Sequence, residues 1–306
     1  MQNQYQRYLQ LFVDFCKESG ESWPPRVEDL DPLLPDYMDL LYLQGRGPQE
    51  GEKTVAAVEY NFIAAKGNMF RAKRALKGWR KVSPAQSRPP LPRVAMFGGL
   101  MNLLAAGLHD MALMTLVAFF LCLRPGEAID LKGTNMIKPV KSAGLQFQWV
   151  RVAVREQEGG RPDKVGVYDN CIPFDLPSMH WIGDLLLQKA KALPKNKELI
   201  FQFSMGEYRK QFSKAASFLG LNGFHPYQLR HGGATEDMTS GARDHNSIKS
   251  RGRWRTDPSV RRYAKVGRVQ ELLNQISPRD IQFCTNAEKR VQRVFLGQSA
   301  ARFSHL

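Results

Sequence analysis

The stretch MALMTLVAFFLCLRPGEAIDL, residues 111–131, changes character abruptly at Arg124. Its first 13 residues are apolar except for one threonine. Spanning a bilayer takes about 20 such residues, so this run predicts a helix buried in a protein core. Arginine is rarely buried without a partner, and Pro125 suits the first turn of a new helix that carries Glu127. Arg124 and Glu127 are therefore either an internal salt bridge or part of a functional site.

The composition points to an anionic partner. The chain has 306 residues, of which 43% are hydrophobic, a value typical of globular proteins. Its formal charge is +15 and its pI is 9.8, which favours nucleic acid first and an acidic membrane second. Residues 14–52 hold ten acids and three bases, whereas residues 53–93 hold ten bases and one acid, and residues 249–268 hold eight bases and one acid. Apolar and aromatic residues interrupt both basic clusters, so we expect charged faces of folded elements.

The sequence shows no motif for a metal, a nucleotide cofactor or secretion. The cysteines form no Cys/His ligand pattern, which indicates a reducing compartment and no structural zinc. The N-terminal sequence is not a signal peptide, so we expect an intracellular protein without a membrane span. No nucleotide-binding glycine loop and no carboxylate cluster is evident, so we expect neither a metal nor another cofactor. The four cysteines are Cys16, Cys122, Cys171 and Cys284.

The first part of the chain predicts a small helical domain. Basic residues crowd one expected helix at 71–81. The segment SPAQSRPPLP, residues 83–92, contains four prolines and predicts an extended, semi-rigid path. We therefore expect one domain at residues 1–86 and a second at residues 93–306. The first expected helix has apolar side chains at three- and four-residue steps, at Tyr5, Tyr8, Leu9, Phe12 and Phe15.

The second domain predicts helices around a small sheet. Residues 93–123 are apolar and predict a long helix, whereas residues 147–154 form a β-rich run. Residues 155–163 suit a turn, and residues 164–174 then return as an antiparallel strand. Helical patterns resume from about residue 176. The sequence thus predicts a mainly α protein with a small antiparallel β-sheet.

Two further motifs carry groups suited to phosphate chemistry. In HPYQLRHGGAT, residues 225–235, Tyr227 and Arg230 lie one helical turn apart and His231 is adjacent. A solvated helix start accounts for this motif as well as a phosphate site does. Lys164 follows a Gly-Gly-Arg-Pro-Asp turn, a position at which a lysine is usually only solvated.

The stretch GRWRTDPSVRRYAK, residues 252–265, places Trp254 and Tyr263 nine residues apart among arginines. Thr256 or Asp257 can cap a short helix there. The simplest interpretation is that both aromatic side chains pack in the core. The density of positive charge around Tyr263 favours a second interpretation, in which the phenol has a chemical role.

Taken in order, these motifs resemble the tyrosine recombinase (phage integrase) family over about residues 95–270. Arg124 lies in LRPGEAIDL, similar to the family's GLRxxELxxL box. Arg230 and His231 lie in YQLRHGGAT, similar to its HxLRHxxAT box. Trp254 takes the His/Trp position, and Tyr263 the nucleophile position, of its G[HW]…Y box.

Two positions depart from the family pattern. Tyr227 stands where the family usually has His or Lys. Lys164 stands farther from the first arginine than the hairpin lysine of the family usually does, so Arg155 and Arg161 are alternatives for its role. We favour Lys164 because KVGVYDNCIPF resembles the Lys-x-Gly strand of the family.

The resemblance implies a SAM-like helical core-binding domain, a linker and an α+β tyrosine recombinase catalytic domain, as in the integrases of mobile elements, including those of eukaryotic type. Such proteins bind double-stranded DNA, associate as tetramers on it, and cut and rejoin strands through a covalent 3′-phosphotyrosine without metal. The protein would then act wherever DNA is held, in a nucleus or a nucleoid. A type IB topoisomerase uses similar residues, but the helical front domain and the linker favour a recombinase. A catalytically impaired DNA-binding relative and a nucleic-acid-binding scaffold without chemistry remain the alternatives.

The resemblance also implies roles for single residues. Tyr263 would be the nucleophile, and since a tyrosine phenol has a pKa of about 10, nearby positive charge would favour its ionised form. Arg124 and Arg230 would each contact non-bridging phosphate oxygens in a bidentate way, and Lys164 would protonate the leaving 5′ oxygen. The cations beside the nucleophile, which would also grip flanking phosphates, are Arg261, Arg262 and Lys265.

The remaining expected groups assist. Trp254 would donate its indole N–H to the phosphate, and Glu127 would orient Arg124 or a neighbouring base. His231 and Tyr227 would supply hydrogen bonds or move a proton to and from the nucleophile. The helical domain would close on DNA as one half of a clamp, through the bases Arg71, Lys73, Arg74, Lys77, Arg80 and Lys81.

Overall fold

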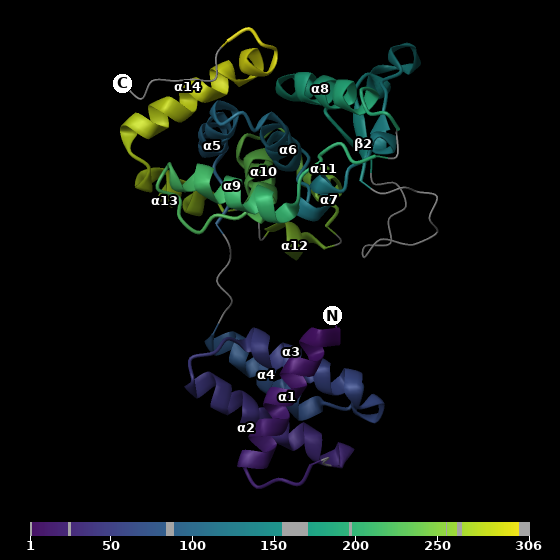
Figure 1. Cartoon of the computed structure of the whole chain (residues 1–306), viewed down its shortest axis with the longest axis vertical. Helices are drawn as coiled ribbons and strands as arrows, with labels where there is room; N and C mark the ends of the chain where they lie inside the picture. The colour runs from purple at the N-terminus through teal and green to yellow at the C-terminus, as the bar shows by residue number, and fades with distance from the viewer. Residues whose placement is uncertain are drawn as a thin grey trace. The chain divides into compact units, whose positions relative to one another are not determined.

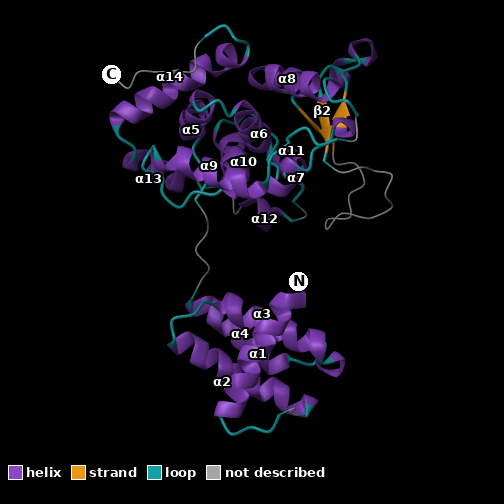
Figure 2. Ribbon diagram, viewed as in Figure 1, coloured by secondary structure: helices purple, strands orange, loops and turns teal. Residues whose placement is uncertain are grey.

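The computed structural model of the chain describes residues 2–23, 26–83, 89–154, 171–195, 198–254, 256–261 and 265–299. The chain divides into two compact units, residues 1–87 and 88–306. In the described part of the chain, helices dominate both units and the strands belong to the second (Figures 1 and 2). The predicted mainly α fold with a small antiparallel sheet is confirmed.

Unit 1 is a bundle of amphipathic helices. Side chains at three- and four-residue steps meet in one core, in which Phe12, Leu34 and Met38 are buried. The α-helices described in this unit are α1 (Gln2–Glu18), α2 (Val27–Leu43), α3 (Pro48–Asn61) and α4 (Phe70–Val82). A short 3-10 helix, η1 (Ile63–Ala65), precedes α4.

Helix α4, the basic helix predicted at 71–81, is fixed at its start by Asp31 and along one side by the core. The Asp31 carboxylate of α2 accepts hydrogen bonds from the backbone N–H groups of Arg71 and Ala72, both at 2.9 Å. These are two of the N–H groups that a helix start leaves without an internal partner. Leu76 and Trp79 bury the opposite side of α4 in the core. The basic side chains are therefore held on the outer faces of the helix.

Unit 2 surrounds α6, which is buried over nearly its whole length (Figure 1). The predicted long helix at 93–123 is instead two helices, because the chain reverses at Gly107, whose φ of 76° favours glycine. The helices described here are α5 (Arg93–Ala105), α6 (His109–Phe120), α7 (Pro125–Ile129), α8 (His180–Lys191), α9 (Met205–Ser217), α10 (Tyr227–Thr239), α11 (His245–Arg251), α12 (Asp257–Arg261), α13 (Val266–Gln275) and α14 (Pro278–Phe295).

The sheet has three short antiparallel strands in the order β1 (Met136–Ile137), β2 (Arg151–Ala153) and β3 (Cys171–Pro173). Val152 pairs with Ile172, and both side chains are buried. Within the strand predicted for residues 164–174, the described part, residues 171–173, returns antiparallel to β2 as expected. The turn at 155–163 and Lys164 lie outside the described residues.

The second half of the predicted linker packs on unit 2. Leu91 is 3% exposed, and its N–H donates to the Gln228 carbonyl at 3.3 Å. Residues 84–88 lie outside the described part of the chain. Among the helices that the structure describes, none has the length and apolar character that a bilayer crossing requires.

Candidate functional site

Two glycines bring α10 against the end of α6. A Cβ added at Gly232 would lie 2.2 Å from the Leu91 carbonyl oxygen, and one at Gly233 would lie 2.0 Å from the Phe119 oxygen. Neither position therefore admits a side chain, since real Cβ atoms do not approach a carbonyl so closely. This close approach places Arg230 beside the residues that follow α6.

Arg230 is buried and held by backbone. It is 1% exposed, and its Nη1 and Nη2 donate to the carbonyls of Cys122 and Gly252. Its buried Nε has no hydrogen-bond partner among the described residues. Cys122 has a φ of 48°, uncommon for a residue other than glycine. A strained residue thus presents the carbonyl that receives Arg230.

Trp254 lies under this guanidinium, whose central carbon is 4.7 Å from the centre of the indole ring. Trp254 is 9% exposed and packs in a small core with Ile248 and Val260. A Cβ at Gly252 would lie 1.8 Å from the ring, so the indole rests against bare backbone. Trp254 therefore packs in the core, as the simplest interpretation of its motif predicts, and it also contacts Arg230; donation of its indole N–H to a phosphate stays a prediction.

Arg124 and Glu127 form a second, more exposed part of the site at the start of α7. Arg124 Nη1 lies 2.6 Å from Glu127 Oε1, and the Arg124 backbone N–H donates to Oε2 at 2.7 Å. The Arg124 side chain is 39% exposed. Burial alone would lower the pKa of Arg124, but the hydrogen bond and charge of Glu127, together with the Tyr227 phenol, raise it. Arg124, Glu127 and Tyr227 therefore lie together, and Arg124 stays charged.

Arg253 joins the two parts. Its side chain is 4% exposed, and its Nη2 donates to Glu127 Oε2. Its buried Nη1 has no hydrogen-bond partner in the described part of the chain. Burial lowers the pKa of Arg253 to about 10, against the charge of Glu127, and the charges of Arg230 and Arg124 lower it further. The guanidinium groups of Arg124 and Arg230 are thus each close enough to Arg253 to repel it.

A cleft of about 920 Å³ opens beside this group. Val154, the last described residue before the segment that carries Lys164, is part of its wall. The polar residues that line it are Arg124, Glu127, Asp130, Arg209, His225 and Tyr227.

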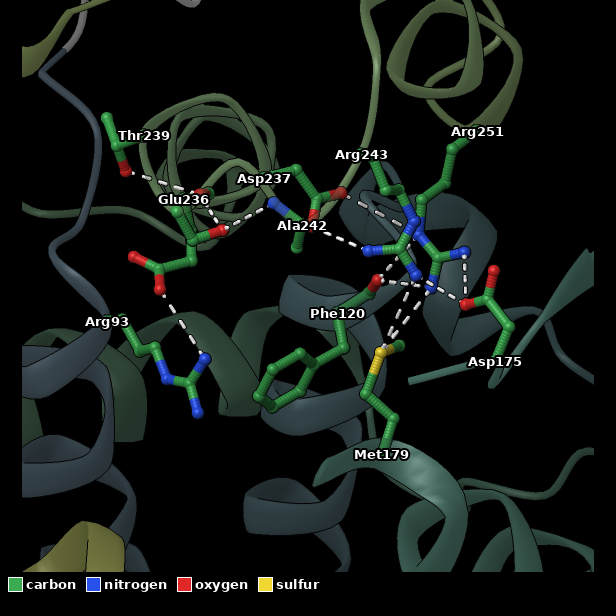
Figure 3. A network of polar contacts seen from close by, with 11 residues as sticks. Arg93, Phe120, Asp175, Met179, Glu236, Asp237, Thr239, Ala242, Arg243 and Arg251 are labelled. Atoms are coloured by element: carbon green, nitrogen blue, oxygen red, sulfur yellow. Dashed lines mark hydrogen bonds and ion pairs between the residues drawn. The ribbon is translucent and has the colours of Figure 1, made fainter. Parts of the chain in front are cut away.

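Two further buried arginines, Arg243 and Arg251, form a polar network at the end of α6 (Figure 3). Arg251 donates through Nε and Nη2 to the Phe120 carbonyl, at 3.0 and 2.9 Å. Arg243 donates to Asp237 at 2.8 Å and to Asp175, which also pairs with Arg251 at 3.3 Å. The network joins α6, α10, α11 and the segment after β3.

We call Arg124, Arg230, Arg243, Arg251 and Arg253 the arginine cluster. The carboxylates that pair with it are Glu127, Asp175 and Asp237, so five positive charges face three negative ones. Burial raises the pKa of Asp237, although Arg243 and Arg251 oppose it. Around Glu127, the three charges of Arg124, Arg230 and Arg253 face a single carboxylate, and this excess of positive charge suits that part of the cluster to bind an anion.

The other expected residues are placed less fully. The His231 ring lies 5.2 Å from the Tyr227 ring, both on the first turns of α10. Arg261 ends α12 with an exposed side chain, and Lys265 precedes α13, where burial first and then Arg268 lower its pKa. Tyr263 and Arg262, with the lysine or arginine proposed as general acid (Lys164, Arg155 or Arg161), lie outside the described residues.

In unit 1 the basic residues of α4 divide into two groups. Lys73 pairs with Glu59 at 2.6 Å, and Arg80 pairs with Glu52 at 2.8 Å, both across to α3. The remaining four are exposed and make no ion pair with any described residue; they are Arg71, Arg74, Lys77 and Lys81.

The sequence motifs missed Arg243, Arg251 and Arg253. They counted there only as part of a basic segment, because nothing local indicates that these side chains point inward. The spacing of Arg251, Arg253 and Trp254 around Gly252 is the one available signal.

No group of three or more His, Cys, Asp or Glu side chains that could hold a metal ion occurs among the residues described.

No protein-family model and no curated protein matches this sequence. Among solved structures, the chain is distantly similar to the crystal structure of XerA recombinase. The TM-score is 0.42 and the sequence identity 16%, and the match covers 89% of this chain and 98% of that one. This distant likeness assigns no function by itself.

Proposed function

We propose that this protein is a DNA strand transferase of the tyrosine recombinase type, which cuts and rejoins DNA through a phosphotyrosine at Tyr263. The observation that carries the proposal is the shared site of three guanidinium groups. Glu127 contacts both Arg124 and Arg253, and the charges of Arg124 and Arg230 both act on Arg253. Arg124 thus lies close to Arg253 and shares its surroundings with Arg230, although these residues of the two later motifs are 129 and 106 positions further along the chain.

The charge of this site suits a phosphate. A phosphodiester gains negative charge on its non-bridging oxygens as a nucleophile attacks, and fixed guanidinium groups stabilise that charge without reorganising. Arg124, partly exposed at the cleft, offers the flat donor set that matches two phosphate oxygens. Its pairing with Glu127 keeps it in place until the anion arrives.

The proposed reaction conserves the energy of the bond that it breaks. The Tyr263 oxygen forms a bond to phosphorus as the bond from phosphorus to the 5′ oxygen breaks, and that oxygen takes a proton from Lys164. The 3′ phosphate stays on Tyr263 until a 5′ hydroxyl attacks it in the reverse sense. Trp254, His231 and Tyr227 would assist by hydrogen bonds, and no nucleotide cofactor is required.

Unit 1 would bind the same duplex through α4, and the two units would act as a clamp. The excess of exposed bases on this helix supports the assignment. Assembly of several copies on DNA follows from the reaction type, since recombination joins strands of two duplexes.

The proposal is tested by trapping the covalent adduct. A pool of nicked duplexes of random sequence releases a short product after cleavage, which prevents rejoining. The full-length protein should form an adduct that survives denaturation, with mass spectrometry placing the nucleotide on Tyr263, and Tyr263→Phe should form none. Binding of the pool without any adduct would contradict strand transfer.

One observation favours a second candidate, a DNA-binding relative without chemistry. Arg230 is 1% exposed and gives both terminal nitrogens to backbone carbonyls. Such an arginine also suits a purely structural role. This candidate predicts salt-dependent binding of the duplex pool and no adduct, so the same experiment separates the two.

The general acid has its own test. Lys164→Ala should slow cleavage of an ordinary duplex by roughly 10²–10⁴-fold, the usual contribution of an acid. It should largely spare a duplex whose bridging 5′ oxygen is replaced by sulfur, because a thiolate leaves without a proton. Rescue by sulfur in Arg155→Ala or Arg161→Ala instead would move the role to that arginine. Full activity of Lys164→Ala on both substrates would show that this lysine is only solvated.

A further inference from the structure

Arg253 has no role in the sequence motifs, yet it occupies the centre of the site. It immediately precedes Trp254, and its backbone has a φ of 53°, a left-handed conformation that is unfavourable for a residue other than glycine. Its side chain is 4% exposed and turns inward to Glu127. A buried arginine in a strained backbone is retained only where the surrounding structure requires it.

Glu127 is the point at which this arginine acts. One carboxylate oxygen, Oε1, accepts from Arg124 Nη1, and the other, Oε2, accepts from the Arg124 backbone and from Arg253 Nη2. Glu127 is 11% exposed in its side chain. A carboxylate so buried is stable as an anion only with such partners.

We propose that Arg253 is a positioning residue: by holding Glu127, it fixes the Arg124 guanidinium in the geometry that receives the phosphate, and it ties the Trp254 segment to the start of α7. This inference rests on the proposed strand transfer. When a phosphate takes the Arg124 guanidinium, Glu127 keeps a partner in Arg253. Without Arg253, Glu127 would compete with the phosphate for Arg124.

Arg253 also differs from the other buried arginines. Arg243 and Arg251 pair with Asp175 and Asp237. Among the described residues, Glu127 forms its ion pairs with Arg124 and Arg253 instead. Arg243 therefore offers a matched control, a buried guanidinium whose removal disturbs packing without touching the Arg124–Glu127 pair.

The test is a double-mutant cycle on adduct formation, with the duplex recovered from the trapping experiment. Arg253→Met should slow the reaction about 10²-fold, the cost of a misplaced reacting group, with duplex affinity little changed. Arg253→Lys keeps a charge beside Glu127 and should recover to within about tenfold of wild type, the effect of removing one charged hydrogen bond. In the Arg124→Met background, Arg253→Met should add no more than about twofold.

Arg243→Met should behave differently. It should lower the thermal stability, and it should change the rate of adduct formation by the same factor in the wild-type and the Arg124→Met backgrounds. If Arg253→Met multiplies its full effect onto Arg124→Met, Arg253 does not act through Arg124 and the inference is wrong. Should Arg253→Met fail to fold, Arg253→Lys takes its place in the cycle, where the same non-additivity is expected. Absence of any adduct from the wild-type protein would overturn the proposed function itself, whereas an adduct insensitive to Arg253 overturns only this inference.

Discussion

Helix α4 and the arginine cluster both present an excess of positive charge, but the two regions differ in how that charge is held. The four α4 bases without an ion pair to a described residue point outward, and each can move independently. The arginines of the cluster are mostly buried, and backbone carbonyls or carboxylates fix them.

The difference implies two kinds of recognition. Exposed cations neutralise phosphates one at a time and release counterions, which gives salt-dependent binding that is not specific for one phosphate. Buried guanidinium groups are costly to desolvate. Such burial is useful where the guanidinium groups must hold one phosphate in a single orientation. We therefore expect unit 1 to set affinity and the cluster to set rate.

We expect Arg230→Lys to give the largest effect on the rate of adduct formation. A rate near that of wild type would contradict the division of roles between unit 1 and the arginine cluster. A lysine keeps one positive charge but cannot bond the Cys122 and Gly252 carbonyls while stacking on Trp254. We expect adduct formation to fall about 10²–10³-fold, as when one fixed donor to a developing charge is removed. Duplex affinity should change little.

The control for Arg230→Lys is Arg93→Lys. Arg93 pairs with Glu288 at 2.8 Å, and its side chain is 28% exposed. Its pair with Glu236, at 3.4 Å, is drawn in Figure 3. The variant Arg93→Lys should form adduct at the wild-type rate. A folded Arg230→Lys that forms adduct within about twofold of wild type would assign Arg230 a structural role only.

The bases of α4 should give a smaller effect, on affinity. Arg74 and Lys77 lie three residues apart on one face, without an ion pair among the described residues, whereas Lys73 and Arg80 are drawn toward α3 by Glu59 and Glu52. Arg74→Ala with Lys77→Ala should flatten the salt dependence of duplex binding by about two units, one for each phosphate that the helix no longer neutralises. The rate of adduct formation at saturating DNA should stay unchanged.

The control removes the same charge from the paired group. Lys73→Ala with Arg80→Ala should flatten the slope less, because the ion pairs of Lys73 and Arg80 already compete with phosphate. Burial would raise the pKa of Glu59, but the hydrogen bond and the charge of Lys73 lower it, so this ion pair is favourable. Equal slopes for both double variants would show that the ion pairs open on DNA. An unchanged slope for both would place the DNA away from α4.

The sequence predicted those parts of the site that local motifs mark. Arg124 follows a buried apolar run, and Arg230 precedes two glycines that admit no Cβ beside Leu91 and Phe119. The antiparallel strands followed from alternating β-rich runs on either side of a turn. Each of these signals is local, and the longest extends from residue 147 to residue 174.

What the sequence did not predict depends on distant partners. Arg253 and Glu127 are separated by 126 positions, and Asp175 and Arg243 by 68. The division of the α4 bases into two groups likewise depends on acids of another helix. The break at Gly107 was missed because an apolar run does not distinguish one long helix from two that pack together.

The smallest expected effect concerns Glu127 and the acid limit of stability. Burial would raise the pKa of Glu127, but Arg253 and the hydrogen bonds from Arg124 bring it below the ordinary value of 4.5. The unfolded chain then takes up a proton before the folded protein does, so the stability due to this carboxylate is full above pH 4.5 and is lost as the pH falls toward its folded pKa. Glu127→Gln should therefore show a shallower decline of melting temperature than wild type below pH 4.5. Glu271→Gln removes a pair with Arg268 whose side chains are 61% and 69% exposed, and since exposed pairs contribute about 0–1 kcal/mol, its profile should follow the wild type. Parallel acid limbs for Glu127→Gln and wild type would mean that the pair with Arg253 does not stabilise the fold, and the cluster would then be as loosely held as the bases of α4.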